Sequence, residues 1–337
     1  MGWIARTSAT VTWTALMAAR WLRGPREDFH GKVVVITGGS RGLGLELARC
    51  FASEGARVAV CGRDERSVQR AADELREGGH EAMGVPCDVR RRDDVKALIE
   101  TVVQRWGGID VLVNNAGIIQ TGPAMCMTLE DFREAMDTHF WGALYTIVAA
   151  LPAMRARGGG RVVNISSIGG LVAVPHLLPY VASKFALAGF SAGLRTELAQ
   201  ENIRVTTVFP GLMRTGSPRN ASFKGDHRAE YAWFSISDSL PGITIGSERA
   251  ARQIMEACRR GDPELVLTWV AKCLAKVHGL FPSATSDVLR LVNRILPSAG
   301  GIRARAMRGS ESESMWSPSW LTALSQRAEI RNHQVDK

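Results

Sequence analysis

The sequence predicts an α/β fold in which a doubly wound parallel sheet lies between two layers of helices. Short β-branched runs alternate with longer amphipathic stretches from Lys32 onward, the pattern of repeated β-α units. The first run, Val33 to Thr37, is apolar throughout, as expected for a strand buried on both faces. With 337 residues, 45% of them hydrophobic, the chain can bury a sizeable core. We therefore expect a three-layer sandwich.

The expected strands and helices alternate along the chain as far as Phe209. Each helix lies between two strands of this series, and Gly78 and Gly79 end the second one. Strands are expected at residues 33–37, 57–61, 81–86, 111–114, 161–165 and 204–209. Helices are expected at residues 43–53, 66–77, 93–106, 129–154 and 180–200.

The regularity lapses after Pro210 and returns only at about Ser247. A helix at 247–260 and a strand at 264–267 would complete the sheet, and residues 212–245 would form an irregular lid, which is usually functional in a compact domain. Residues 268–337 form a C-terminal extension with apolar helical stretches at 269–280 and 287–296. Its polar tail, including residues 311–314 and 327–337, is expected to be mobile at least in part.

Residues 1–30 form a separate N-terminal extension. Trp13, Leu16, Met17 and Trp21 recur at helical spacing, which indicates an amphipathic helix. It either packs on its own domain or rests on a membrane surface as a peripheral contact. A helix that spans the membrane is disfavoured because two arginines within this segment would be costly there.

Charge and cysteine content exclude several classes of protein. The net charge of +9 is spread along the chain without a long basic run interleaved with aromatic residues, so a nucleic-acid partner is not expected. We interpret the positive charge as a solvated, arginine-rich surface, although attraction to anionic phosphates or to an anionic membrane surface stays open. The six cysteines contain no CxxC pair, which fits neither a zinc site nor a disulfide framework. We expect no metal site and a reducing, cytoplasmic location.

A glycine-rich loop follows the first strand and opens the first helix. Gly38, Gly42 and Gly44 stand in the segment from Thr37 to Gly44. Residues without a Cβ let the backbone turn tightly and approach a pyrophosphate, which free N–H groups and the helix dipole attract. The loop therefore predicts a Rossmann-type dinucleotide site in preference to a purely structural turn.

The end of the second strand favours NADP(H) over NAD(H). NAD-binding folds commonly place a carboxylate there, and it would repel a 2′-phosphate. This chain has Arg63 instead, with no acid before Asp64. Together with Arg41 in the glycine loop it could clamp a phosphate. The alternative is that both arginines merely lie on the surface.

Tyr180 and Lys184 are four residues apart on a predicted helix, so they share one face. An unperturbed tyrosine has a pKa of about 10, and proton transfer near neutrality is easier when an ammonium group stabilises the phenolate. The pair thus predicts acid–base chemistry.

Further motifs extend the pattern along the chain. They are the loop at Thr37 to Gly44, Asp88-Val89, Asn114-Asn-Ala-Gly117, Ser167 thirteen residues before Tyr180, the Tyr-x-x-x-Lys pair, and Pro210-Gly-x-x-x-Thr215. In this order the chain resembles the short-chain dehydrogenase/reductase family over about Gly31 to Leu267. The resemblance implies a catalytic domain at residues 31–267, including the lid, and an NADP(H)-dependent enzyme that interconverts an alcohol and a ketone or aldehyde.

The resemblance also implies roles for individual residues. Ser167 would polarise the carbonyl, Tyr180 would transfer its proton, and Lys184 would bind the nicotinamide ribose and lower the pKa of the tyrosine. Asp88 and Val89 would hold the adenine. The implied cofactor-binding set is Thr37, Gly38, Ser40, Arg41, Gly42, Leu43, Gly44, Arg63, Asp88, Val89, Asn115, Ala116, Gly117, Tyr180, Lys184, Pro210, Gly211 and Thr215.

One position departs from the family's pattern. The family usually has an asparagine that holds a relay water where this chain has catalytic candidate His139. The main-chain carbonyl of His139 could hold the relay water if the helix is locally distorted. The neutral imidazole ring could also replace the asparagine side chain, because it offers one hydrogen-bond donor and one acceptor. Because a free histidine has a pKa of about 6.5, we expect activity to fall in mild acid and His139→Asn to remove that fall.

The lid predicts the class of substrate. It offers Met213, Phe223, Tyr231, Trp233 and Phe234, which favour a bulky apolar alcohol or carbonyl compound if they line the pocket, or simply pack the lid if they do not. His176 and Gln120 could border the same pocket. A homo-oligomer, dimer or tetramer, is implied by the resemblance, through the helices around Phe132 and Phe185. The competing hypothesis is a catalytically impaired NADPH-binding sensor or scaffold.

Overall fold

The computed structural model describes residues 26–240, 242–314, 317 and 322–334. The predicted helix at residues 3–22 therefore lies outside the described residues. The core is a seven-stranded sheet in which every neighbouring pair is parallel, in the order β11-β7-β6-β4-β1-β2-β3. Its strands are β1 (Val33–Thr37), β2 (Arg57–Gly62), β3 (Ala82–Pro86), β4 (Val111–Asn114), β6 (Gly160–Ile165), β7 (Ile203–Phe209) and β11 (Glu264–Val266).

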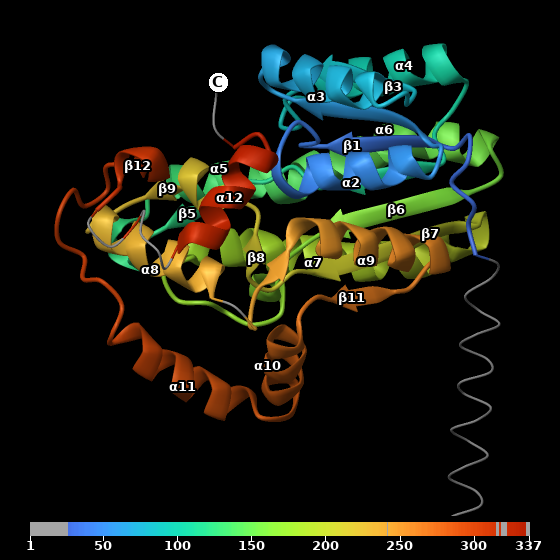
Figure 1. Cartoon of the computed structure of the whole chain (residues 1–337). Coiled ribbons are helices and arrows are strands. Elements are labelled where there is room, and N and C mark those ends of the chain that lie inside the picture. Colours follow the sequence, from blue (N-terminus) through green and yellow to red (C-terminus); the bar gives the residue numbers. More distant parts are fainter. Residues whose placement is uncertain (1–25, 241, 315–316, 318–321, 335–337) are drawn as a thin grey trace, which may run out of the picture.

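Helices cover both faces of this sheet (Figure 1). One face carries α2 (Gly42–Ser53), α3 (Glu65–Glu77) and α9 (Ser247–Arg260). The other carries α4 (Arg92–Trp106), α6 (Gly142–Ala156) and α7 (Leu178–Leu198). The predicted doubly wound, three-layer sandwich is confirmed.

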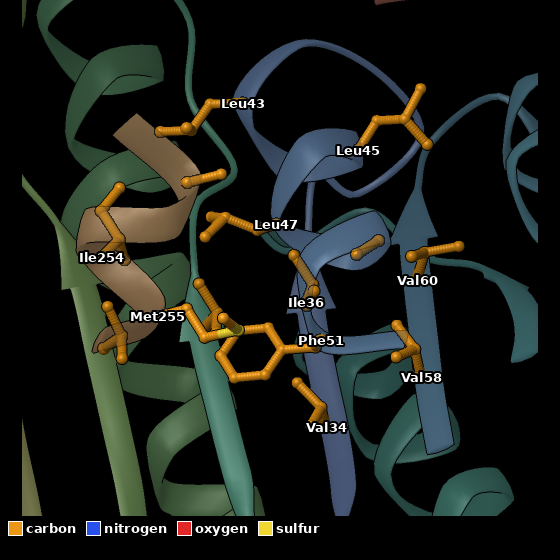
Figure 2. Packing of buried hydrophobic residues seen from close by; sticks show 14 of the residues in the cluster. Val34, Ile36, Leu43, Leu45, Leu47, Phe51, Val58, Val60, Ile254 and Met255 are labelled. Atoms are coloured by element: carbon orange, nitrogen blue, oxygen red, sulfur yellow. The ribbon is translucent and has the colours of Figure 1, made fainter. Parts of the chain in front are cut away.

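The core between α2, α9 and the sheet explains why α2 packs as it does (Figure 2). Leu43, Leu47 and Phe51 lie at helical spacing and are buried against Ile36 of β1 and Ile254 of α9. Apolar side chains at positions i, i+4 and i+8 share one helix face, so their burial fixes the rotation of α2 about its axis. Only residues 38–41 separate β1 from α2, so the N-terminal end of α2 lies near the carboxyl end of β1.

The strand order reverses beside β1. The chain runs outward through β2 and β3, then crosses back so that β4 pairs with the opposite side of β1. In open α/β sheets, ligands bind outside the carboxyl ends of the strands at such a reversal. The fold thus places the glycine-rich loop after β1 next to the loop after β4.

A single long helix at 129–154 was expected, and the structure corrects it. The segment consists of α5 (Leu129–Met136), the π-helical segment η2 (Asp137–Trp141) and α6. The N–H of Gly142 donates to the carbonyl of Asp137, five residues earlier. Such π segments are frequent at functional sites, and this one contains His139.

The lid is not irregular as predicted, because it contains the helix α8 (His227–Ser239). Asp226 caps this helix by accepting from the N–H of Ala229. Short strands surround it: β8 (Met213–Arg214) pairs with β10 (Ile245–Gly246), and β9 (Ser222–Phe223) lies between β5 (Gln120–Thr121) and β12 (Met307–Arg308). The hydrophobic periodicity of this segment is weak because the buried face of α8 itself contains polar residues, among them Glu230, Ser235 and Asp238.

The C-terminal extension contains α10 (Trp269–Leu280), α11 (Pro282–Asn293) and α12 (Ala323–Arg331). The helix expected at 287–296 begins earlier, with a proline in its first turn. In the polar tail, α12 packs on the body and the chain continues to the glycine-rich loop, while the expectation that the tail is mobile at least in part stays a prediction. Residues 309–311 likewise form a short 3-10 helix. Within the described residues, each helix is too short or too polar to span a bilayer.

Candidate active site

The glycine-rich loop forms a close cradle at the end of β1. A Cβ on Gly44 would lie 2.2 Å from the carbonyl oxygen of Gly38, and one on Gly38 would lie 2.9 Å from the Cα of Ala116. Gly38 and Gly42 also have positive φ angles of 63° and 60°. Only glycine fits such approaches without displacing backbone. The predicted loop residues, including Leu43 at the start of α2, thus fit a dinucleotide.

Thr37 and Asn115 join the loops after β1 and β4. The Thr37 hydroxyl accepts from the N–H groups of Asn115 and Ala116, at 3.0 and 3.1 Å. The Asn115 side-chain amide donates to the carbonyls of Thr37 and Gly38. These hydrogen bonds hold the ends of β1 and β4 together. In the same loop, a Cβ on Gly117 would lie 3.1 Å from the ring of His139. Asn115 thus joins the loops after β1 and β4, and its place in the cofactor-binding set stays a prediction.

The polar groups expected around the adenosine end lie near one another. Arg41 is the exposed N-cap residue of α2, and Ser40 lies close to Gly62 at the end of β2. Arg63 is also exposed at the end of that strand.

Asp88 is held by Arg90, whose guanidinium forms hydrogen bonds of 2.6 to 3.0 Å with both carboxylate oxygens. Although burial opposes it, these bonds keep the pKa of Asp88 below its usual range. Val89 is buried against Gly142. The Arg90 contact was not predicted, and it favours the ionised form of Asp88, the residue expected to hold the adenine.

Ser167, Tyr180 and Lys184 come together at the carboxyl ends of the central strands. Ser167 follows β6, while Tyr180 and Lys184 lie one turn apart on α7. The Ser167 hydroxyl accepts from the N–H of Gly169 at 3.0 Å and is hydrogen-bonded to the Tyr180 phenol. The ammonium group of Lys184 lies 5.6 Å from the centre of the Tyr180 ring and donates to the carbonyl of Ile165 at 2.8 Å.

Burial controls the ionisation of this group. It raises the pKa of Tyr180 above its ordinary value, against the lowering effect of the Ser167 hydrogen bond. It also lowers the pKa of Lys184 to about 7. The tyrosine pKa was expected to be lowered by the lysine; in the protein alone desolvation outweighs that effect, because a low-dielectric site disfavours both charged forms.

His139 is fully buried and both of its ring nitrogens have protein partners. Nε2 accepts from the N–H of Ile118 at 3.1 Å, so Nδ1 carries the hydrogen and donates to the Ser183 hydroxyl at 2.7 Å. The Ser183 hydroxyl in turn donates to the carbonyl of Tyr180. The ring therefore ties η2 to α7 and has no nitrogen left for a relay water.

The expected protonation of His139 in mild acid is corrected. Burial, followed by repulsion from Lys184, holds the pKa of His139 well below its usual range. The ring is neutral as predicted, but an acidic fall in activity near its unperturbed pKa is no longer expected from it. The local helix distortion that the main-chain role requires is present in η2.

The loop after β7, which is expected to contact the nicotinamide, lies beside Ser167. The carbonyl of Pro210 accepts from the N–H of Ile168, beside Ser167. A Cβ on Gly211 would lie 2.8 Å from the hydroxyl of Thr268. Thr215 is buried, and its hydroxyl accepts from the N–H of Ser217.

A buried chain of polar side chains beneath the site was missed by sequence reasoning. Thr146 donates to Asn114, Asn114 donates to Asn164, Asn164 donates to Ser191, and Ser191 is bonded to Thr207. Only Asn114 stood in a motif, because these residues are far apart in the sequence. Buried polar groups need partners, so this network fixes how α6 and α7 sit on the sheet.

The lid is held over Tyr180 by a buried carboxylate. The carboxylate of Glu230 on α8 is hydrogen-bonded to Nδ1 of His176 at 2.6 Å. It also accepts a hydrogen bond of 2.6 Å from the indole N–H of Trp233. Gln120 instead donates to Glu134. Aromatic side chains of the lid pack in one cluster with Tyr180, and they are Phe223, Tyr231, Trp233 and Phe234. Met213 packs against the α2–α9 core instead, away from this cluster.

Comparison with known proteins identifies relatives of this arrangement. The family model described as short chain dehydrogenase matches residues 32–224. Dehydrogenase/reductase SDR family member 7B of Danio rerio is 37% identical over 296 residues, covering 85% of this chain and 90% of that protein.

Two solved structures are similar with a TM-score of 0.64. L-sorbose reductase from Gluconobacter frateurii, complexed with NADPH and L-sorbose, is 28% identical, and the match covers 72% of this chain and 97% of that one. A variant of actinorhodin polyketide ketoreductase with NADPH is 33% identical, covering 71% and 96%.

Proposed function

This chain belongs to the short-chain dehydrogenase/reductase family of oxidoreductases, and on that basis we propose that it is an NADP(H)-dependent enzyme interconverting an alcohol and a ketone or aldehyde. The observation that carries the proposal is the meeting of Ser167, Tyr180 and Lys184 at one point of the sheet edge. The glycine cradle that ends beside them supports a bound dinucleotide.

The chemistry follows from these side chains. The cofactor, when bound, supplies the hydride that reduces the carbonyl carbon, or accepts it in the reverse direction. The Ser167 hydroxyl donates to the carbonyl oxygen and orients it. The Tyr180 phenol delivers its proton to that oxygen, which becomes the alcohol. The Lys184 ammonium group stabilises the tyrosinate that remains and binds the nicotinamide ribose.

Selectivity for NADP(H) is the finer part of the proposal. Arg41, the N-cap residue of α2, and Arg63, just after β2, are both exposed where the adenosine ribose would lie, and no carboxylate precedes Arg63 on β2. A guanidinium pair matches the geometry and charge of a 2′-phosphate. The two related structures that contain NADPH agree with this choice.

A bulky, largely apolar substrate is supported by the lid. The aromatic cluster that contacts Tyr180 would surround whatever lies above the phenol. Substrate entry then requires α8 to move, since its aromatic side chains pack directly over the catalytic tyrosine.

Cofactor oxidation across a broad panel of ketones and aldehydes tests the proposal. We expect NADPH consumption with at least one apolar carbonyl compound. Tyr180→Phe should abolish turnover while NADPH binding stays nearly unchanged, because only the transferable proton is lost. Tyr145→Phe, on α6, is the matched control and should keep full activity. NADPH binding without turnover of any compound would favour the sensor or scaffold hypothesis instead.

We propose a homo-oligomer that is formed through α5, α6 and α7. These helices, together with η2 between α5 and α6, present large apolar side chains to solvent in the single chain, namely Leu129, Trp141, Val148 and Phe185. A second copy of the same surface would bury them, as expected for a two-fold interface. Light scattering on the purified protein should give the mass of a dimer or tetramer.

We also propose that the protein resides in the cytoplasm and touches a membrane surface peripherally. The consecutive helices α10 and α11 lie apart from the central sheet and its flanking helices, at the bottom of the view in Figure 1. On α11, Val288 and Leu291 are exposed at helical spacing, and Ile295 is exposed just beyond its C-terminal end. Arg290 on the helix and its C-cap residue Arg294 lie beside them. Apolar side chains with flanking cations suit an anionic lipid surface.

Co-sedimentation with vesicles containing phosphatidylserine tests this contact. Val288→Asp together with Leu291→Asp should release the protein from the vesicles, and so should deletion of the residues before Asp28. Binding that neither change reduces, or an intact chain that stays in the supernatant at low salt, would contradict the proposal.

A further inference from the structure

The C-terminal segment that follows α12 reaches the N-terminal end of α2 (Figure 1). The main-chain carbonyl of Asn332 accepts a hydrogen bond of 2.9 Å from the N–H of Gly42, the first residue of α2. The side chain of Gln334 also lies against Gly42, because a Cβ on Gly42 would be 2.8 Å from the Gln334 amide nitrogen. Both Asn332 and Gln334 are buried. The tail therefore covers the glycine-rich loop directly.

Several contacts clamp this segment in place. The Asn332 amide donates to the carbonyl of Thr215 and to the hydroxyl of Ser247. Asn220 donates to the main-chain and side-chain oxygens of Gln334, at 3.1 and 2.7 Å. The segment is thus joined both to the loop after β7 and to the start of α9, two elements that border the proposed cofactor site.

Arg331 adds an electrostatic hold. Its guanidinium bonds Glu248 at 2.5 Å and the hydroxyl of Ser247 at 3.0 Å, and it lies 3.3 Å from Glu46 of α2. The main-chain carbonyl of Arg331 accepts from Arg49, also on α2. The tail is therefore attached to the side of α2 as well as to its end.

The Asn332 carbonyl occupies the position that favours an anion. The first N–H groups of a helix have no partner within the helix, and the helix dipole adds positive potential at that end. A dinucleotide pyrophosphate is bound by these groups in folds of this type. The carbonyl oxygen, with its negative partial charge, uses the Gly42 N–H that a phosphate oxygen would need.

We propose that residues 331–334 form a latch that competes with the cofactor pyrophosphate for the N-terminal end of α2. The latch is closed in the cofactor-free protein and opens when the cofactor binds, so its contacts set cofactor affinity and loading rate. This inference rests on the proposed function, since it assumes that a nicotinamide dinucleotide occupies the glycine cradle.

Weakening the latch at a distance from the cradle tests the competition. Arg331→Ala removes the contacts with Glu46, Ser247 and Glu248, which are individually weak because the guanidinium is partly exposed. We expect NADPH to bind the variant about three- to tenfold more tightly, with a faster association rate in stopped-flow fluorescence. Arg290→Ala removes a comparable exposed ion pair with Asp287 on α11 and should leave both values unchanged.

Hydrogen exchange gives a readout that is independent of turnover. In the cofactor-free protein, Arg331→Ala should speed exchange at the Gly42 amide. Adding NADPH to the unmodified protein should speed exchange at residues 328–334 while it slows exchange in the first turn of α2. A chain that ends at Ile330, checked for folding by its thermal transition, should show the largest gain in affinity.

The outcomes separate the latch from the proposed function. The latch is overturned if the parent, Arg331→Ala and the chain that ends at Ile330 all bind NADPH equally, because the tail then has no effect on cofactor binding. It is also overturned if NADPH slows exchange at residues 328–334, because the tail is then part of the cofactor site. If no form binds a nicotinamide dinucleotide although the Gly42 amide is freed, the proposed function fails and the competition fails with it.

Discussion

Lys184 illustrates how burying one proposed catalytic side chain lowers the stability of the folded protein. Burial lowers its pKa to about 7 in the folded protein, whereas an unfolded lysine titrates near 10.4. Between these two pH values the unfolded chain binds a proton that the folded protein does not. Stability therefore rises with pH through this window, and the cost of burying the amine is complete at and below about pH 7.

This sign gives a measurable expectation. In the cofactor-free protein, Lys184→Met should raise the melting temperature relative to the parent most at pH 7, and the difference should shrink as the pH approaches 10. Lys272→Met, at an exposed position on α10, is the control and should show no such trend. A pH-independent difference for Lys184→Met would mean that the buried amine is not the source of the cost.

At the scale of one residue, Arg63 tests the proposed preference for NADP(H). Loss of a charge-assisted contact to phosphate costs about 1.5–3 kcal/mol, or roughly tenfold to hundredfold in affinity. Arg63→Ala should therefore weaken NADPH binding by that factor and leave NADH binding nearly unchanged, and Arg41→Ala should act in the same direction. Titration of intrinsic fluorescence measures both. Arg105→Ala, an exposed residue on α4, should alter neither, and equal binding of NADPH and NADH by the parent would refute the assignment.

At the scale of elements, a buried carboxylate helps to hold α8 in place. Glu230 is fully buried and bonds His176 and Trp233, so it fixes the lid helix over the aromatic cluster. Glu230→Gln keeps the shape but replaces one charge-assisted acceptor with an amide donor. We expect KM for the carbonyl substrate to rise several-fold while NADPH affinity is unchanged.

Steady-state kinetics with the best substrate of the panel measures this effect. Glu264→Gln, exposed on β11, serves as the matched substitution outside the lid. A fall in kcat at constant KM would place Glu230 in the chemical step and contradict a role in holding the lid.

For the whole molecule, stability comes from the two apolar layers on either side of the sheet. Leu47 is completely buried between α2, α9 and the sheet. Leu47→Ala should lower the free energy of unfolding by about 2–5 kcal/mol, because it removes buried methylene groups and leaves a cavity. Urea denaturation of the cofactor-free protein measures it.

Leu280→Ala provides the comparison. Leu280 is 74% exposed on α10, so its replacement should change the unfolding free energy by no more than about 0.5 kcal/mol. A similar loss for both variants would show that α10 is packed more extensively than its exposure indicates.

The sequence by itself determined the features that depend on neighbours along the chain. Uninterrupted apolar runs fixed the buried parallel strands, and helical spacing fixed α2, α9 and α10 close to their observed ends. The glycine loop and the Tyr180–Lys184 pair were predictable too, because their geometry is set by the backbone of a single turn or helix. These local rules account for the three-layer fold and the composition of the site.

The tertiary structure alone decided the features that depend on contacts between distant segments. The polar chain from Thr146 to Thr207, the two partners of His139 and the position of the C-terminal segment join residues far apart in sequence. The π segment interrupts a pattern that reads as one helix, and the polar tail packs although its composition predicted mobility. Burial and hydrogen-bond partners, which set these pKa values and positions, are properties of the folded molecule, so no local pattern in the sequence could encode them.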